Sequence, residues 1–159
     1  NTVNGTVTLG TGASARNINA VNGDVTIGES ASVAGRVELV NGDIRLAAGA
    51  EVAGNVGAVT GSIRLGDAQV DGDVTTVAAD VTLSGSSVIA GRLVVESRGG
   101  IGEAAPRIVI GPGSRVEGVL EFGDDAEVYV SEEAEIGGVQ GVLTEEDIVR
   151  FAGPEPNLQ

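Results

Sequence analysis

A repeat of 18 or 19 residues, carried through most of the chain, constrains the fold more than any other feature of this sequence. Five successive copies start 18, 19, 19 and 18 residues apart, at Asn4, Asn22, Asn41, Thr60 and Ala78. Looser copies start at Arg107 and Asp125. A unit this short cannot bury an apolar face by itself, so successive copies must stack on one another. The period therefore predicts one all-β domain, a solenoid of about seven coils.

Each copy contains three apolar marks separated by glycine-containing turns. The first is an apolar–polar–apolar triplet such as Val7-Thr8-Leu9, whose outer residues point to one side of a strand. The second is a Val-x-Gly-x-Val segment, as from Val33 to Val37, and the third is a valine at the end of the copy. Three short strands per coil predict a roughly triangular cross-section. Stacking at about 4.8 Å then predicts a continuous buried ladder, formed by Val7, Val25, Ile44, Ile63, Val81, Ile108 and Val128.

The dipeptide Asn-Gly begins the first three copies, at Asn4, Asn22 and Asn41. Glycine supplies a positive φ at a corner, and an asparagine amide can bond to the same amide one coil away. Asn-Gly also forms two-residue hairpin turns. The 18-residue spacing and the lack of mirrored strands make a meander of hairpins the poorer interpretation.

Composition narrows the partners that such a solenoid could bind. The chain has 26 glycines, 2% aromatic residues, no cysteine and no histidine, and all nine of its basic residues are arginine. A net charge of −14 argues against nucleic acid and against anionic lipid. Residues 101–159 hold 13 acids and 3 arginines, or −10 of that charge, which indicates either solubility or cation attraction. The sequence contains no window apolar enough for a transmembrane segment.

Two features interrupt the repeat. An insertion covers residues 96–106, so that Leu83 and Ile110 lie 27 residues apart, and solenoids usually place such insertions as loops on one face. This loop is either neutral or a binding loop, whose candidate residues are Glu96, Arg98, Glu103 and Arg107. Beyond the solenoid of residues 1–143, residues 144–159 are expected to form a short capping helix and a tail. That helix would start at the N-cap Thr144, use Leu143 and Ile148 as a staple, and end at Phe151.

The residue inventory supplies no recognisable catalytic, cofactor or metal site. Acyltransferases built on hexapeptide solenoids use a histidine base, and carbonic anhydrases on that scaffold bind zinc through histidines, so the lack of histidine excludes both. The closest acid pairs, Asp71 with Asp73 and Asp124 with Asp125, are more simply solvated turns. We expect no catalytic residue, no cofactor and no small-molecule substrate. An enzyme with an unanticipated carboxylate mechanism is the minor alternative.

The segments IGESASVAGRVELVNGDI, LAAGAEVAGNV and VIGPGSRVEGVLEF resemble the coils of bactofilins, the bacterial proteins that polymerise as β-solenoids. The resemblance covers most of residues 4–142. The repeated VNGDV and VNGDI also resemble uncharacterised exported bacterial proteins built of Asn-Gly coils. These resemblances imply a right-handed coil and a scaffold role.

The expected function is a non-enzymatic structural scaffold in the bacterial cell envelope that associates with itself or with another envelope protein. The first coil offers unpaired strand edges as a possible assembly end, marked by Val3, Val7, Leu9 and Ile18. The alternative is a periplasmic or surface binding module that uses the 96–106 loop or a lateral β-face. An exported, periplasmic location follows from the envelope hypothesis, and a cytoplasmic, membrane-associated location is the alternative.

Overall fold

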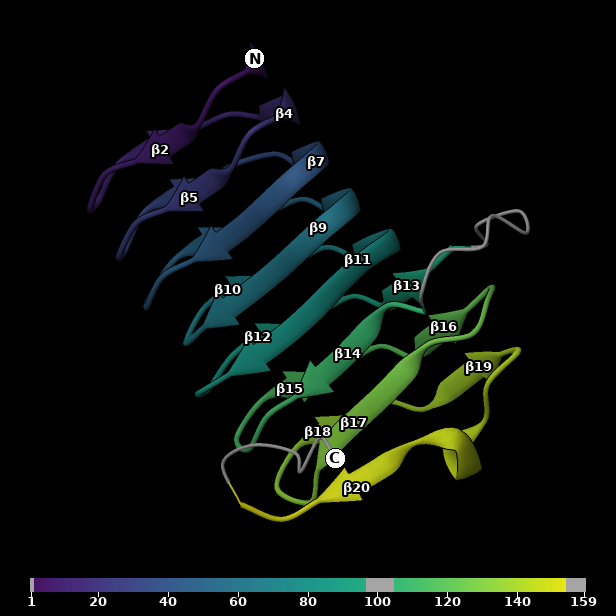
Figure 1. The fold of residues 1–159 in the computed structure, drawn as a ribbon. Helices are drawn as coiled ribbons and strands as arrows, with labels where there is room; N and C mark the ends of the chain where they lie inside the picture. The colour runs from purple at the N-terminus through teal and green to yellow at the C-terminus, as the bar shows by residue number, and fades with distance from the viewer. Residues whose placement is uncertain (1, 97–104, 154–159) are drawn as a thin grey trace.

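The structure, a computed structural model, describes residues 2–96 and 105–153. It is a parallel β-solenoid of about seven turns, with about 19 residues between turns, as the repeat predicts. Figure 1 shows the coils stacked from one end of the chain to the other, wound in the right-handed sense.

Each complete coil contributes a strand segment to each of three faces. The triplet face carries the apolar–polar–apolar triplets, in β2 (Val7–Leu9), β5 (Val25–Ile27), β14 (Arg107–Ile110), β17 (Glu127–Ser131) and β20 (Val149–Phe151). The narrow face consists of two-residue strands, β3 (Ser14–Ala15), β6 (Ser32–Val33), β8 (Glu51–Val52), β10 (Gln69–Val70), β12 (Val88–Ile89), β15 (Arg115–Val116) and β18 (Glu135–Ile136). The valine face holds β1 (Thr2–Asn4), β4 (Ile18–Asn22), β13 (Leu93–Val95), β16 (Leu120–Phe122) and β19 (Val139–Gly141).

Three long strands join the valine face to the triplet face. They are β7 (Val37–Leu46), β9 (Val56–Gly66) and β11 (Val74–Ser84), and each bends around the corner without a break. The two faces therefore form one 13-stranded sheet, and the narrow face forms a separate seven-stranded sheet. Every pairing in both sheets is parallel. No hairpin meander forms in the described part of the chain.

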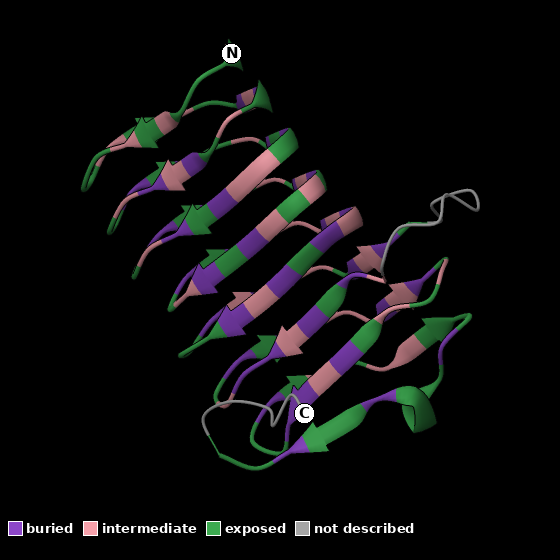
Figure 2. Ribbon diagram, in the orientation of Figure 1, coloured by how far each residue is buried: buried purple, intermediate pink, exposed green. Residues whose placement is uncertain are grey.

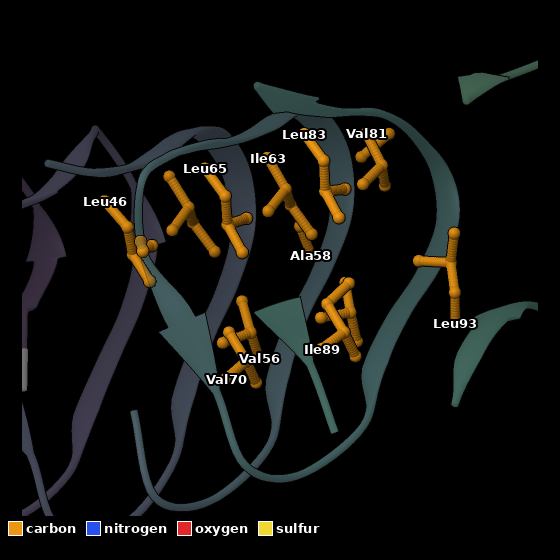
Figure 3. Close-up of a cluster of buried hydrophobic side chains, with 14 of the residues drawn as sticks. Leu46, Val56, Ala58, Ile63, Leu65, Val70, Val81, Leu83, Ile89 and Leu93 are labelled. Atoms are coloured by element: carbon orange, nitrogen blue, oxygen red, sulfur yellow. The ribbon is translucent and has the colours of Figure 1, made fainter. Parts of the chain in front are cut away.

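The core is a set of ladders that run along the solenoid axis. The ladder predicted from the triplets is present, because each of its residues is paired in register with the next one, from Val7 through Val128. All of its members except Val7 are buried. Figure 2 shows the alternation of buried and accessible residues along β7, β9 and β11, and Figure 3 shows the aliphatic side chains that fill the space between the faces. Each such side chain contributes about 1.5–3 kcal/mol on full burial.

The Asn-Gly corner forms the amide ladder that the sequence predicts. Asn22 Nδ2 donates a hydrogen bond to Asn4 Oδ1 at 3.0 Å, and Asn41 Nδ2 donates to Asn22 Oδ1 at 3.0 Å. In the next coil the hydroxyl of Thr60 donates to Asn41 Oδ1 and so extends the ladder. The corner thus links neighbouring coils through side chains as well as through the backbone.

Residues 144–153 form no α-helix, so the predicted C-terminal capping helix is not confirmed. A 3-10 turn, η1 (Glu145–Asp147), is followed by β20, which pairs with β17. Helix nucleation is unfavourable for a segment this short, whereas the free edge of β17 offers backbone partners at once. The predicted start signal is nevertheless used, because the backbone N–H of Thr144 donates to Asp147 Oδ2 at 2.8 Å. The staple residues Leu143 and Ile148 are both buried in the core.

Candidate interaction surfaces

The acid pairs that the sequence singles out form part of the turns between coils. Asp73 Oδ1 accepts a hydrogen bond from the backbone N–H of Arg92 at 2.7 Å, and its other oxygen lies 3.3 Å from the Arg92 guanidinium. Asp71 Oδ1 accepts from the Gln69 amide at 2.7 Å. In the second pair, Asp124 Oδ1 accepts from the backbone N–H of Asp125. Within the described residues, no group of three or more acidic, histidine or cysteine side chains is placed to hold a metal ion.

Arginines at positions 92 and 115 connect one coil to the next through ion pairs. Arg92 Nη1 lies 2.9 Å from Glu121 Oε2 while its other terminal nitrogen contacts the preceding coil. Arg115 Nε lies 2.7 Å from Glu135 Oε2. These pairs are solvent-exposed, so each contributes little to stability by itself. They nevertheless balance part of the acidity of the second half locally.

The four candidate residues of the assembly end lie in different environments. Val3 is 64% exposed on β1, while Val7 and Leu9 are half-buried on β2. Ile18, on β4, is only 3% exposed, because it lies inside the stack beside Val37. Three of the four are therefore accessible at the first coil, and Ile18 belongs to the core.

Two of the four candidate residues of the insertion are described. Glu96 follows β13 directly and is exposed, and its backbone N–H donates to the carbonyl of Thr76 at 2.8 Å. Arg107 begins β14, and its guanidinium lies 3.1 Å from Glu127 Oε2 in the next coil. Its backbone N–H donates to Asp80 Oδ1 at 2.7 Å, so Arg107 acts within the stack. Arg98 and Glu103 lie outside the described residues.

The third apolar mark of each coil forms an exposed stripe along the valine face. The neighbouring register pairs place these residues side by side in successive coils, and we name them the valine stripe: Val3, Val21, Val40, Val59 and Val77. Val21, Val40 and Val59 are 39–40% exposed. Of the six large hydrophobic side chains exposed among the described residues, four belong to this stripe. Monomeric soluble proteins rarely expose contiguous apolar patches without a functional reason.

The sequence indicates Val21, Val40, Val59 and Val77 as the apolar mark that ends each copy and predicts that they lie inside with the other apolar marks, whereas the structure places them on the outer side of the valine face. The signal was present in the alternation, because Ala20, Leu39 and Ala58 precede the valines and occupy the inward positions. Both neighbours in each pair are apolar, so the pattern by itself left the facing of the strand open.

A polar patch occupies the middle of the triplet face. Thr26, Arg45, Arg64 and Thr82 are paired in register on β5, β7, β9 and β11, and they line a shallow hollow there. Arg45 lies 3.7 Å from Asp43. Within residues 2–96 and 105–153, Arg64 forms no ion pair. Two arginines in adjacent coils repel each other, which an acidic group bound between them would relieve.

Comparison with protein-family models, with curated proteins and with solved structures finds no match to this chain. The part of the chain that the structure describes has no helix of the length and apolar character needed to cross a membrane.

Proposed function

We propose that this chain is a non-enzymatic structural module, a stiff scaffold that associates with further copies of itself. The observation that carries the proposal is the unbroken ladder from Val7 to Val128, which ties every coil to the next through core packing and backbone hydrogen bonds. All buried side-chain polar atoms of the described residues have a hydrogen-bond partner. A rod packed in this way suits a role in which spacing and surface presentation matter more than movement.

The cell-envelope part of this proposal rests on resemblance. Bactofilin-like coils imply a polymer-forming scaffold, and the Val-Asn-Gly coils imply an exported protein. We place the scaffold in the envelope of a bacterial cell, on the periplasmic side. A cytoplasmic, membrane-associated scaffold is the alternative location, and its partners would equally be other copies of this chain or a neighbouring envelope protein.

A second candidate function is a binding module that uses a lateral face. The observation in its favour is the polar patch, where Arg64 has room for an acidic group beside Arg45. Such a module would act as a monomer, whereas a scaffold must form larger species. The state of association therefore separates the two functions.

The experiment that tests the scaffold is light scattering after size-exclusion chromatography over a wide concentration range, with negative-stain microscopy of the same fractions. We expect species larger than a dimer whose mass rises with concentration. If the first coil takes part, Leu9→Asp reduces this growth, because Leu9 is half-buried and inward-facing, whereas Thr8→Asp on the same strand leaves it unchanged. A species no larger than a dimer at every concentration would contradict the scaffold.

A further inference from the structure

We propose that the valine stripe is the contact surface between two copies of this chain, packed side by side with their solenoid axes antiparallel. This inference rests on the proposed scaffold function, since it gives the self-association a defined surface. Its other grounds are the exposure, charge and register of the valine face and the distribution of charge along the chain.

The valine face is apolar and weakly charged near the stripe. The outward residues of the neighbouring column, in register from coil to coil, are Asn19, Glu38, Gly57, Thr75 and Val94. Glu38 is the one charged residue among these five, and it lies 3.4 Å from Arg36. Beyond them, Glu121 is in register with Val94 and lies 2.9 Å from Arg92, and Glu96 follows Val77 on the next rung of the stripe. On a chain of net charge −14, such a face can approach a second acidic molecule with little direct repulsion.

The regular spacing of the valine stripe restricts which surface can pack against it. The five residues of the stripe follow one another at about 4.8 Å, so the stripe is about 19 Å long. A surface that packs its side chains against all five needs the same repeat, because a mismatch accumulates along the ladder. A second copy of this chain has the same repeat, because its coils are stacked at the same spacing.

The distribution of charge along the chain sets the direction of the second copy. Residues 101–159 carry a net charge of −10, while residues 1–100 carry −4, from six arginines and ten acids. The stripe lies in the first half of the chain. Parallel packing would bring the two acidic halves together along their length, whereas antiparallel packing places them at opposite ends of the pair.

The positions of Glu38 and Gly57 set the register of the pair. A two-fold axis between the rungs of Val40 and Val59 sets Val40 against Val59 of the second copy and Val21 against Val77. The same axis sets Glu38 against Gly57 of the second copy instead of against the second Glu38. Gly57 has no side chain, and a shallow hollow runs past it from Glu38 to Val77, with Glu96 at its edge. The glutamate of each copy therefore finds space in the other.

Gly57→Glu tests this register, and urea denaturation of the variant checks that the fold is kept, because the new carboxylate also lies beside Glu38 of its own chain. A Cβ at Gly57 would meet nothing closer than the carbonyl oxygen of Thr75 at 3.9 Å, so the strand accepts a side chain there. The variant would set two like charges against each other, and we expect the dimer dissociation constant to rise at least about tenfold. The matched control, Thr82→Glu, adds the same charge on the triplet face, and we expect a change of less than about twofold.

Sedimentation velocity over a concentration series measures the dimer dissociation constants of the two variants, Gly57→Glu and Thr82→Glu. Salt should favour the unmodified dimer, because it screens the repulsion between two acidic chains. A monomer at every concentration would overturn the pairing, as would an equal effect of Gly57→Glu and Thr82→Glu. If species larger than a dimer form equally well with and without Gly57→Glu, the proposed pairing is contradicted and the scaffold function is not. If Gly57→Glu weakens a dimer and no species larger than that dimer forms, the scaffold function is contradicted and the proposed pairing is not.

Thiol cross-linking with a short bismaleimide tests the direction, because the chain has no cysteine of its own. In the antiparallel pair Val21 faces Val77 of the second copy, while the two Val21 residues lie three rungs, or about 14 Å, apart. Faces that pack against each other lie about 10 Å apart, which is too far for a direct disulfide, so the two thiols are joined by a bismaleimide whose span is about that distance. A mixture of Val21→Cys and Val77→Cys chains should therefore cross-link, and neither variant alone should do so. Efficient cross-linking of Val21→Cys alone would indicate parallel packing and overturn the proposal.

Discussion

Glycines at the Asn-Gly corner hold successive coils at their stacking distance. Gly42 has φ +136°, a conformation that side chains of L-residues rarely adopt, and a Cβ there would collide with the carbonyl oxygen of Gly23. Gly61 stands in the same relation to Gly42. Gly66, at the end of β9, has ordinary backbone angles, and a Cβ there would lie 3.7 Å from Ser84 Oγ. Glycine is therefore required where the backbones of successive coils approach closely, at the Asn-Gly corner and also in the Val-x-Gly-x-Val turn, where a Cβ at Gly54 would collide with the carbonyl oxygen of Gly35, and it is not required at Gly66.

Gly42→Ala should destabilise the protein through both the backbone strain and the collision. We expect a loss of roughly 1–3 kcal/mol or more in the free energy of unfolding, measured from urea denaturation. Gly66→Ala is the matched control and should change that free energy by less than about 0.5 kcal/mol. Equal stability of the two variants would show that the corner does not impose the close approach described above.

Among the elements, β20 closes one side of the last coil. It pairs with β17 through Tyr129 and Val149 and through Ser131 and Phe151. Ile148 and Phe151 bury their side chains, while Val149 is 52% exposed. Attachment of this strand thus depends on two apolar side chains and a short parallel ladder.

Ile148→Asp should release β20 without unfolding the rest of the solenoid, because each coil depends mainly on its neighbours. Hydrogen exchange should accelerate at the amides of β17 and β20 and stay unchanged at those of β7, β9 and β11. Val149→Asp adds the same charge to the exposed side of the strand and should leave all of these rates nearly unchanged. Global loss of protection in Ile148→Asp would mean that the molecule unfolds as one cooperative unit.

Some elements could be predicted from the sequence and others could not. Thr144 and Asp147 do form the predicted turn, but the sequence could not reveal that the free edge of β17 competes with a helix for the next residues. The strands of the triplet face were predictable, because apolar and polar residues alternate there. The outward facing of Val40 was not predictable, because Leu39 before it is equally apolar.

Over the whole molecule, the fold followed from the repeat because the same packing solution occurs in every coil. The candidate surfaces did not follow in the same way. Whether Val59 or Arg64 lies on a face that a partner can reach depends on how the three faces are arranged around the solenoid axis. The sequence of a single coil does not determine that arrangement. The side-by-side pairing and the scaffold both depend on one geometric claim, that the coils stack rung for rung and resume this register after the insertion.

The distance between spin labels at Thr8→Cys and Val109→Cys tests that claim most directly, because both residues face outward on the triplet face. Five in-register steps separate them, through Thr26, Arg45, Arg64 and Thr82. At about 4.8 Å per step, electron–electron double resonance should give one narrow distribution whose backbone distance is about 24 Å. A broad distribution, or a distance that differs by more than one rung, would contradict the stacked solenoid and the functions proposed from it.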